Sequence, residues 1–215
     1  MKLAFIGMSG AGKTFWATKF EKIGFVRYSI DDLIEQKLDT ELKREGYKGI
    51  HDLAKWMGYP YERRYEKNSK RYLELEEESM RDVLFLIKNS RKNDDIIIDT
   101  TGSLIYLDSQ IIKELKQNVY LVYLETPESV KKIMFELFIK EPKPVIWGES
   151  FVPFNEEESK DALSRCYPLL LNYRCKQYLK YAETVISYHQ LHNAQFTTSE
   201  LLMYLYAEQN VSVGY

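Results

Sequence analysis

The segment from Gly7 to Thr14 constrains the fold of this chain more than any other. It reads G-M-S-G-A-G-K-T and satisfies the pattern G-x-x-x-x-G-K-[ST] in full. In that pattern backbone N–H groups and a helix N-terminus face a phosphate, the lysine reaches the outer phosphates and the Ser/Thr hydroxyl holds Mg²⁺. A buried strand (Leu3–Ile6) precedes the segment and a helix (Phe15–Lys22) is expected after it. This setting favours a nucleotide phosphate site over a glycine turn that binds nothing.

The rest of the chain alternates between strand and helix patterns, which favours a parallel sheet covered by helices. Further strands are expected at 25–29, 95–99, 118–124 and 184–188, and the triplet Ile96-Ile97-Ile98 is typical of a central strand. Long helices are expected at about 69–89, 128–138 and 157–181. A last helix should begin at the capping box Thr197-Thr198-Ser199-Glu200 and run to about residue 209.

Composition excludes several classes of protein. The 215 residues are enough for one domain with insertions, and a net charge of -2 gives no basic field for nucleic acid. No apolar run approaches the roughly 20 residues that span a bilayer, and the N-terminus is too short for a signal peptide. Cys166 and Cys175 lack metal or redox spacing and are expected to be free thiols, which fits a cytoplasmic protein.

Two segments interrupt the alternation. Residues 40–68, within an insertion of about 32–75, are polar and aromatic with several glycines; residues 139–158 contain three prolines around Trp147. Long loops inside a compact domain are often lids or substrate-binding pieces, so we expect an acceptor-binding insertion and a mobile lid. The alternative is that both segments are solvent-exposed insertions without a function.

Carboxylates follow two of the expected strands. Asp31 and Asp32 follow the second strand, at the edge where a phosphate loop opens, and Asp31 could orient an acceptor hydroxyl or take its proton. Capping of the next helix is the alternative for both. Asp99 ends the third strand, where phosphate-loop enzymes often hold a carboxylate directed at Mg²⁺, although it could equally belong to a structural turn.

In order along the chain, further motifs resemble the shikimate kinase family of small-metabolite kinases. The phosphate loop is specific by itself, whereas the other motifs gain weight from their order. They are Ile30-Asp31-Asp32-Leu33-Ile34-Glu35, Arg71-Tyr72-Leu73-Glu74, the V-x-L-x-x-x-P-E segment from Val119, Lys143-Pro144-Val145-Ile146, and Leu170-Leu171-Asn172-Tyr173-Arg174 with Tyr178, Ala182 and Glu183.

The resemblance implies roles for single residues. Asp31 would contact the substrate hydroxyls, and Arg71 and Arg174 would grip its carboxylate, as guanidinium groups suit. Arg165 competes with Arg174 for that place, and Arg71 could instead be a surface residue of a charged helix. Lys143 takes the place of a lid arginine, and Lys132 the place of an arginine beside the adenine.

The chain also departs from the family's pattern. The glycine-only turn after the third strand is here Thr101-Gly102-Ser103, which lies against the substrate in the family, and the segment between Asp31 and Arg71 is longer. A lysine, Lys176, stands where the family has a proline. The departures concern the acceptor side, so the acceptor is either shikimate or another small hydroxy acid.

These observations predict one α/β domain over residues 1–215, of the three-layer, nucleoside-monophosphate-kinase-like type, with about five parallel strands. The expected activity is ATP- and Mg²⁺-dependent phosphorylation of a hydroxyl on a small anionic metabolite, with no nucleic-acid or membrane partner. The residues expected to contact the nucleotide are Gly7, Met8, Ser9, Gly10, Ala11, Gly12, Lys13, Thr14, Phe15 and Lys132. Those expected to bind the acceptor are Asp31, Arg71, Thr101, Gly102 and Arg174; Lys13, Asp31 and Lys143 would be catalytic, and Thr14 and Asp99 would serve the metal.

Two other functions stay open from the sequence alone. The tyrosine-rich insertion could stack a base, which would suit a nucleoside, nucleotide or nucleic-acid-end kinase, although its charges are mixed rather than basic. The altered turn and the lysine in the lid would also suit a nucleotide-binding regulator that has lost turnover.

Overall fold

The computed structural model describes residues 1–212, apart from the side chains of residues 49–51 and 211–212, so residues 213–215 of the expected domain lie outside it. Five parallel strands form one sheet in the order β2-β3-β1-β4-β5. They are β1 (Lys2–Ile6), β2 (Val26–Ser29), β3 (Ile96–Asp99), β4 (Tyr120–Leu124) and β5 (Thr184–Ile186). The predicted α/β fold with a parallel sheet of about five strands is confirmed.

The central strands of the sheet are buried because helices cover them. β3 and β4 are buried along their whole length, as expected of parallel strands. α1 (Lys13–Lys22) packs against β2 and β3, and α9 (Thr198–Ser212) packs on α1, while α7 (Ser159–Tyr181) contacts β4. The other helical segments are α2 (Ile30–Arg44), α3 (Gly49–Met57), α4 (Arg63–Asn89), η1 (Leu104–Tyr106), α5 (Ser109–Asn118), α6 (Glu128–Lys140), η2 (Gly148–Ser150) and α8 (Tyr188–Leu191).

The expected insertion after β2 is more helical than its sequence indicates. α2 continues to Arg44 and α4 already begins at Arg63, so most of residues 40–68 lies in helices. The glycines that made this stretch resemble a loop stand next to helix ends, where Gly46 and Gly58 adopt positive φ angles of 84° and 80°. Asn68 Nδ2 donates to Trp56 O at 2.5 Å and fastens α3 to α4.

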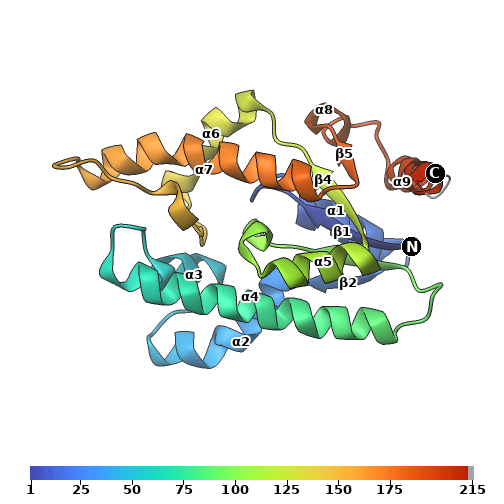
Figure 1. Cartoon of the computed structure of the whole chain (residues 1–215), viewed down its shortest axis with the longest axis horizontal. Helices are drawn as coiled ribbons and strands as arrows, with labels where there is room; N and C mark the ends of the chain where they lie inside the picture. The colour runs from blue at the N-terminus through green and yellow to red at the C-terminus, as the bar shows by residue number, and fades with distance from the viewer. Residues whose placement is uncertain (213–215) are drawn as a thin grey trace.

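The segment expected to be a lid, residues 139–158, begins in the last turn of α6 and ends just before α7. In Figure 1 α4 and α7 both extend beyond the sheet on the same side, and this segment reaches from the α6–α7 pair toward α4. Its middle is fastened to α4: Tyr65 OH donates to Val145 O at 3.2 Å and accepts from Trp147 N at 2.7 Å. Trp147 is 1% exposed, so the middle of the lid is part of the core.

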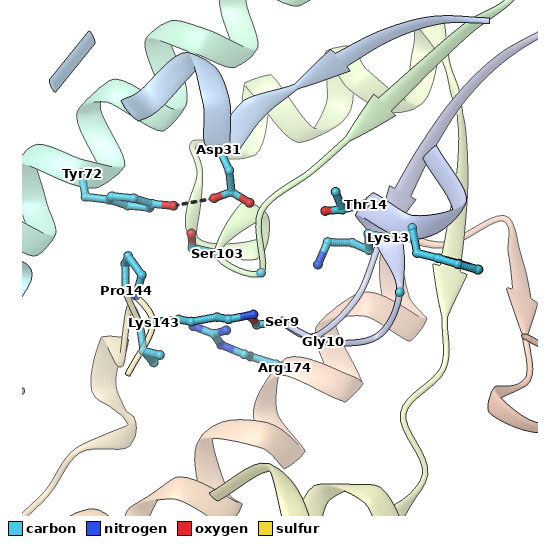
Figure 2. Close-up of a pocket in the computed structure, with 14 residues that line it drawn as sticks. Ser9, Gly10, Lys13, Thr14, Asp31, Tyr72, Ser103, Lys143, Pro144 and Arg174 are labelled. Atoms are coloured by element: carbon cyan, nitrogen blue, oxygen red, sulfur yellow. Dashed lines mark hydrogen bonds between the residues drawn. The ribbon is translucent and has the colours of Figure 1, made fainter. Parts of the chain in front are cut away.

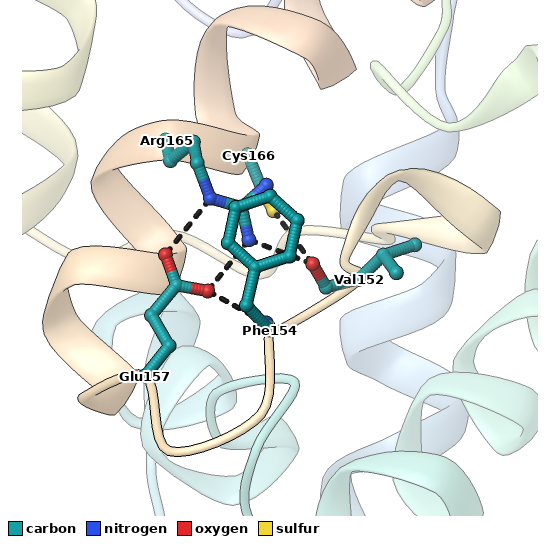
Figure 3. Close-up of polar contacts among 5 residues, drawn as sticks. All are labelled: Val152, Phe154, Glu157, Arg165 and Cys166. Carbon is teal, nitrogen blue, oxygen red and sulfur yellow. Dashed lines mark hydrogen bonds and ion pairs between the residues drawn. The ribbon is translucent and has the colours of Figure 1, made fainter.

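The end of the lid is held by Arg165 of α7 (Figure 3). Its Nε and Nη2 donate to the two carboxylate oxygens of Glu157 at 2.8 and 2.6 Å, and Nη2 also donates to Val152 O at 2.8 Å. The guanidinium stacks 3.7 Å from the centre of the Phe154 ring. Hydrogen bonds from Arg165 and from the Phe154 backbone lower the pKa of Glu157 to about 2. Arg165 is therefore a lid anchor.

None of the described helices is long and apolar enough to cross a membrane.

Candidate active site

The phosphate loop joins β1 to α1 through a turn that only glycine fits at two places. A Cβ on Gly7 would lie 2.8 Å from the carbonyl oxygen of Leu124 in β4. Gly12, the N-cap of α1, has a φ of 93°, a region that L side chains rarely adopt. The turn therefore stays close to the sheet and points the N-terminus of α1 into the cavity in front of it.

Lys13 lies inside this loop rather than in solvent. It is 7% exposed, and its Nζ donates to the carbonyl oxygens of Gly7 and Met8, both at 3.0 Å. Burial lowers its pKa, while the carboxylates of Asp31 and Asp99 raise it. A buried ammonium with only carbonyl partners is suited to bind an anion at the mouth of the loop.

One cavity of about 290 Å³ lies in front of the loop, and residues from six segments of the chain line it (Figure 2). Three cations reach it, since Lys13, Lys143 of the lid and Arg174 of α7 all line it. Burial lowers the pKa of Lys13 most, and the charges of Arg174 and Lys143 lower it further. Its full lining is Ser9, Gly10, Gly12, Lys13, Thr14, Phe15, Asp31, Tyr72, Gly102, Ser103, Lys143, Pro144, Val145 and Arg174.

Asp31 lies on the opposite side of the cavity from Lys143 and Arg174. It is free of the capping role that the sequence left open, because Ser29 caps α2 by accepting from Asp32 N at 3.3 Å. Its Oδ1 instead accepts from the hydroxyl of Tyr72 at 3.1 Å (Figure 2). Burial raises the pKa of Asp31, and the charge of Lys13 opposes this rise.

The two arginines of the expected carboxylate clamp are not brought together. Arg174 is 5% exposed and lines the cavity, where its Nη2 donates to Ile146 O at 2.6 Å. The Arg71 side chain is 39% exposed and lies 3.7 Å from Glu41 and 3.6 Å from Glu74, outside the cavity. Successive helix residues point about 100° apart, so it is Tyr72 that faces the cavity from α4. The structure does not place Arg71 at the cavity, so its contact with the acceptor stays a prediction.

The turn after β3 also differs from expectation. Gly102 and Ser103 line the cavity, but Thr101 does not. Thr101 is 2% exposed, and its hydroxyl donates to the buried carboxyl of Glu76 in α4. A Cβ on Gly102 would lie 3.1 Å from Arg174 Nη1 and 3.5 Å from Ser9 N, so this glycine lets the turn pass between the phosphate loop and the arginine.

Of the two residues expected to serve the metal, one lines the cavity and the other is buried. Thr14 lines the cavity, whereas Asp99 is 3% exposed and does not line it. Asp99 Oδ2 accepts from Arg27 Nη2 at 2.8 Å, and its Oδ1 is buried without a hydrogen-bond partner. Within residues 1–212 no group of three or more His, Cys, Asp or Glu could hold a metal ion by itself. A hydroxyl and one carboxylate oxygen with a free lone pair fit an Mg²⁺ that arrives with the phosphates of a nucleotide.

A second, mainly apolar cavity of about 200 Å³ adjoins the first across Ser9 and Gly10. It reaches from the phosphate loop to α6 and α8, and its size and lining suit the base of a nucleotide. Lys132 is exposed and does not line this cavity, so its place beside the adenine stays a prediction. The cavity is lined by Ser9, Gly10, Ala11, Thr126, Val130, Met134, Leu137, Phe138, Glu141, Lys143, Val145, Tyr167 and Tyr188.

The comparisons support the fold. A solved structure of shikimate kinase from Acinetobacter baumannii in complex with shikimate matches this chain with a TM-score of 0.52 at 18% sequence identity. The match covers 100% of this chain and 95% of that one. No protein-family model and no curated protein matches the sequence. This chain therefore has a shikimate-kinase-like fold, and its chemistry has to be argued from the site.

Sequence reasoning did not single out Tyr72 and Glu76, whereas it placed Ser103 beside the acceptor as part of the turn after β3. Tyr72 and Glu76 are four residues apart and share the buried face of α4. The signal for Tyr72 was its place among apolar residues at helical spacing. Glu76 gave no signal, because it stands in the acidic run Glu74, Glu76, Glu77 and Glu78.

Proposed function

We propose that this protein is a kinase that transfers the γ-phosphate of ATP to a hydroxyl of a small anionic metabolite, with Mg²⁺ bound to the nucleotide. The observation that carries the proposal is that Lys13, Lys143, Arg174 and Asp31 all line one cavity, with Asp31 across it from Lys143 and Arg174 (Figure 2). Phosphoryl transfer depends mainly on positioning and on neutralising the charge of the transferred group, and this set of residues can do both.

Each group has a role that follows from its place. The N–H groups of the loop and Lys13 would bind the β- and γ-phosphates, and Thr14 would bind the Mg²⁺ that neutralises them, with Asp99 reaching it through water. Asp31 would orient the acceptor hydroxyl and accept its proton, helped by the burial that raises its pKa. Arg174 would bind the acceptor's acid group, and Lys143 would meet the transferred phosphate from the lid.

A small acceptor fits this cavity better than a nucleoside. The stacked pair Tyr59 and Tyr61, 5.5 Å apart, could hold a base, but neither ring lines the cavity of the phosphate loop. Tyr72 is the aromatic residue that faces the acceptor side there, and its hydroxyl is bound to Asp31.

The test is an acceptor panel that contains shikimate, other hydroxy acids and nucleosides, with ATP and Mg²⁺, read as release of ADP. The proposal expects release that depends on a hydroxy acid and disappears in Lys13→Ala, whereas the exposed Lys22→Ala on the same helix keeps it. Release that depends on a nucleoside would replace this proposal with the base-binding alternative. Nucleotide binding without release on any acceptor would indicate a regulator, and normal turnover in Lys13→Ala would refute the mechanism.

A further inference from the structure

A third cavity lies where the insertion meets the lid, and the proposed transfer does not use it. Ala54 of α3 and the turn residues Gly58 and Tyr59 line it from the insertion, whereas Phe138 of α6 and Trp147 of the lid line it from the other side. Its volume is about 230 Å³, close to the 200 Å³ of the base cavity. We call it the seam cavity, because the insertion and the lid meet around it.

Three aromatic rings form walls of the seam cavity. The Tyr59 ring meets the Phe138 ring edge to face, with centres 5.9 Å apart at 88°, and the Phe138 ring lies 6.2 Å from that of Trp147. Tyr61 and Phe151, with ring centres 6.5 Å apart, add a contact between the insertion and the lid outside the cavity. A cavity of this size between aromatic walls suits one flat apolar ring.

The polar residues that line the seam cavity are mainly cationic. Lys55, Arg64 and Lys143 line it, against the single carboxylate of Glu62, whose Oε2 accepts from Arg64 Nε at 2.7 Å. Lys55 Nζ lies 2.9 Å from Asp52 Oδ1. Among the residues that the structure describes, Lys143 has no partner in a hydrogen bond or an ion pair. The excess of positive charge favours an anionic ligand, and Lys143 is the cation available to bind it.

Lys143 also connects the seam cavity to the candidate active site. It lines the cavity of the phosphate loop and the base cavity as well, and Val145 does the same. An acid group that pairs with Lys143 from the seam cavity would therefore compete with the transferred phosphate for this lysine. The same ligand would touch both the insertion and the lid, and opening of a lid is often required for product release.

We propose that the seam cavity is a regulatory site for an aromatic carboxylate, a flat apolar ring that carries one acid group, and that the bound ligand lowers turnover by pairing with Lys143 and holding the lid against the insertion. The effect on turnover rests on the proposed kinase function, whereas the binding does not. The site is distinct from the other two cavities, because Ala54, Lys55 and Gly58 line the seam cavity and neither of the others.

The first experiment measures binding without turnover. Benzoate is the probe, because it has no hydroxyl to phosphorylate; benzamide removes its charge and cyclohexanecarboxylate its flatness. The amide resonances of Gly58 and Gly10 are followed by NMR, since Gly10 lines both of the other cavities. We expect benzoate to shift Gly58 with a Kd on the order of 1–10 mM, also with Mg²⁺ and a non-hydrolysable ATP analogue bound, and both other probes to bind about fivefold more weakly.

A benzoate shift at Gly10 alone would place the ring in another cavity and overturn the proposal. Equal binding of benzamide would refute the choice of an anion, and equal binding of cyclohexanecarboxylate would refute the choice of an aromatic ring.

Two substitutions locate the site without touching the proposed catalytic residues. Lys55→Glu reverses one charge at the cavity and should weaken benzoate binding about fivefold, and Ala54→Met fills the cavity and should weaken it about tenfold or more. Lys43→Glu is the matched control, because Lys43 is an exposed lysine that pairs with Asp39 at 2.7 Å, as Lys55 pairs with Asp52. If Ala54→Met does not fold, Lys55→Glu carries the test. An equal loss in Lys43→Glu would show that only the overall charge attracts benzoate, which would refute the site.

The second experiment measures release of ADP with a hydroxy acid that the panel shows to be phosphorylated. At roughly five times its Kd, benzoate should lower kcat about sixfold, because about one sixth of the enzyme stays free, and should leave KM for the hydroxy acid unchanged. A rise in that KM at constant kcat would place benzoate in the acceptor cavity, and an unchanged kcat despite the shift at Gly58 would refute the regulation. If Gly58 reports binding while no hydroxy acid reacts, the kinase proposal fails and the binding site stands.

Discussion

At the scale of single residues, burial decides which charged side chains can act on a ligand. Arg165 and Arg174 lie nine residues apart on α7, yet Arg165 is committed to Glu157 in the lid, whereas Arg174 is buried against the cavity. The Nε of Arg174 is buried without a hydrogen-bond partner, and its Nη1 lies beside Gly102. An unpaired donor on a buried cation is costly in the free protein, which favours an anion as its partner.

Arg174→Lys is the substitution that tests this arginine. It keeps the charge and removes the bidentate geometry, so KM for a hydroxy acid should rise tenfold to about a hundredfold, the range for hydrogen bonds to charged groups. KM for ATP should change little. Arg71→Lys serves as the control, because Arg71 lies outside the cavity, and its KM values should stay within about twofold of wild type. An equal effect of the two variants would mean that Arg71 also reaches the acceptor.

The raised pKa of Glu76 predicts how the stability of the protein depends on pH. Its pKa of about 7 in the folded protein lies above the ordinary 4.5, so the folded state holds a proton that the unfolded state releases. Its contribution to stability is therefore complete below about pH 4.5 and is lost as pH rises through 7. In urea unfolding, the free energy of unfolding of Glu76→Gln relative to that of wild type should rise by on the order of 3 kcal/mol between pH 4.5 and 8. Glu78→Gln should show no such trend; a pH-independent difference for Glu76→Gln would contradict the raised pKa.

The sequence predicts the residues of this site unevenly. Lys13, Thr14 and Asp31 were found because a motif and the edge of a parallel sheet fix their places, and all three line the cavity. Arg71 lies one position of helical phase away from the residue of α4 that lines the cavity, and hydrophobic spacing in a highly charged helix does not resolve such a shift. Thr101 was expected to face the acceptor, but its partner Glu76 is contributed by a helix distant in sequence.

At the scale of elements, the lid is a bridge between the two sides of the cavity. Its backbone is held at residues 145–147 by Tyr65 of α4 and by Arg174 of α7, and just before these attachments Lys143 and Pro144 line the cavity of the phosphate loop. A segment expected to be a mobile flap therefore has a structured path over the cavity. Any opening for a ligand has to break these few hydrogen bonds.

Tyr65→Phe tests the attachment to α4. It removes the donor to Val145 O and the acceptor of Trp147 N, and leaving these groups unpaired should cost about 1–3 kcal/mol of the free energy of unfolding. Hydrogen exchange should become faster at residues 145–147, and KM for ATP should rise because Lys143 is held less firmly. Tyr61→Phe is the control, since Tyr61 is 41% exposed. Unchanged exchange in Tyr65→Phe would show that packing of Trp147 alone holds the lid.

The helices of the insertion show why elements are harder to predict than the sheet. The strands have short apolar runs such as Ile96-Ile97-Ile98, which identify a buried parallel strand on their own. α3 is one short helix between two glycines, and its residues Leu53 and Trp56 become buried only when α2 and α4 are in place. Tertiary packing decides its structure, and the local pattern does not contain that information.

At the scale of the whole molecule, the strand order places β1 between β3 and β4, so the phosphate loop leaves the sheet at its centre. Asp31 follows β2 and the turn at Gly102 follows β3, which brings both to the same edge as the loop. α4 and α7 then extend past this edge (Figure 1), and Tyr72 and Arg174 on these helices line the cavity from different sides (Figure 2). The site is therefore assembled from elements across the whole chain, and a ligand bound there should stabilise all of them together.

Binding of a nucleotide should raise the thermal stability of the entire protein. A ligand at a hundred times its Kd stabilises the folded state by about 2.7 kcal/mol, which for a chain of this size corresponds to a rise in Tm of roughly 5–11 °C. We expect this rise with Mg²⁺ and a non-hydrolysable ATP analogue, as one unfolding transition followed by both tryptophan fluorescence and far-ultraviolet circular dichroism. Lys13→Ala should remove most of the rise, and Lys22→Ala should keep it. A rise that is equally large in Lys13→Ala would place the nucleotide away from the phosphate loop and would contradict the proposed site.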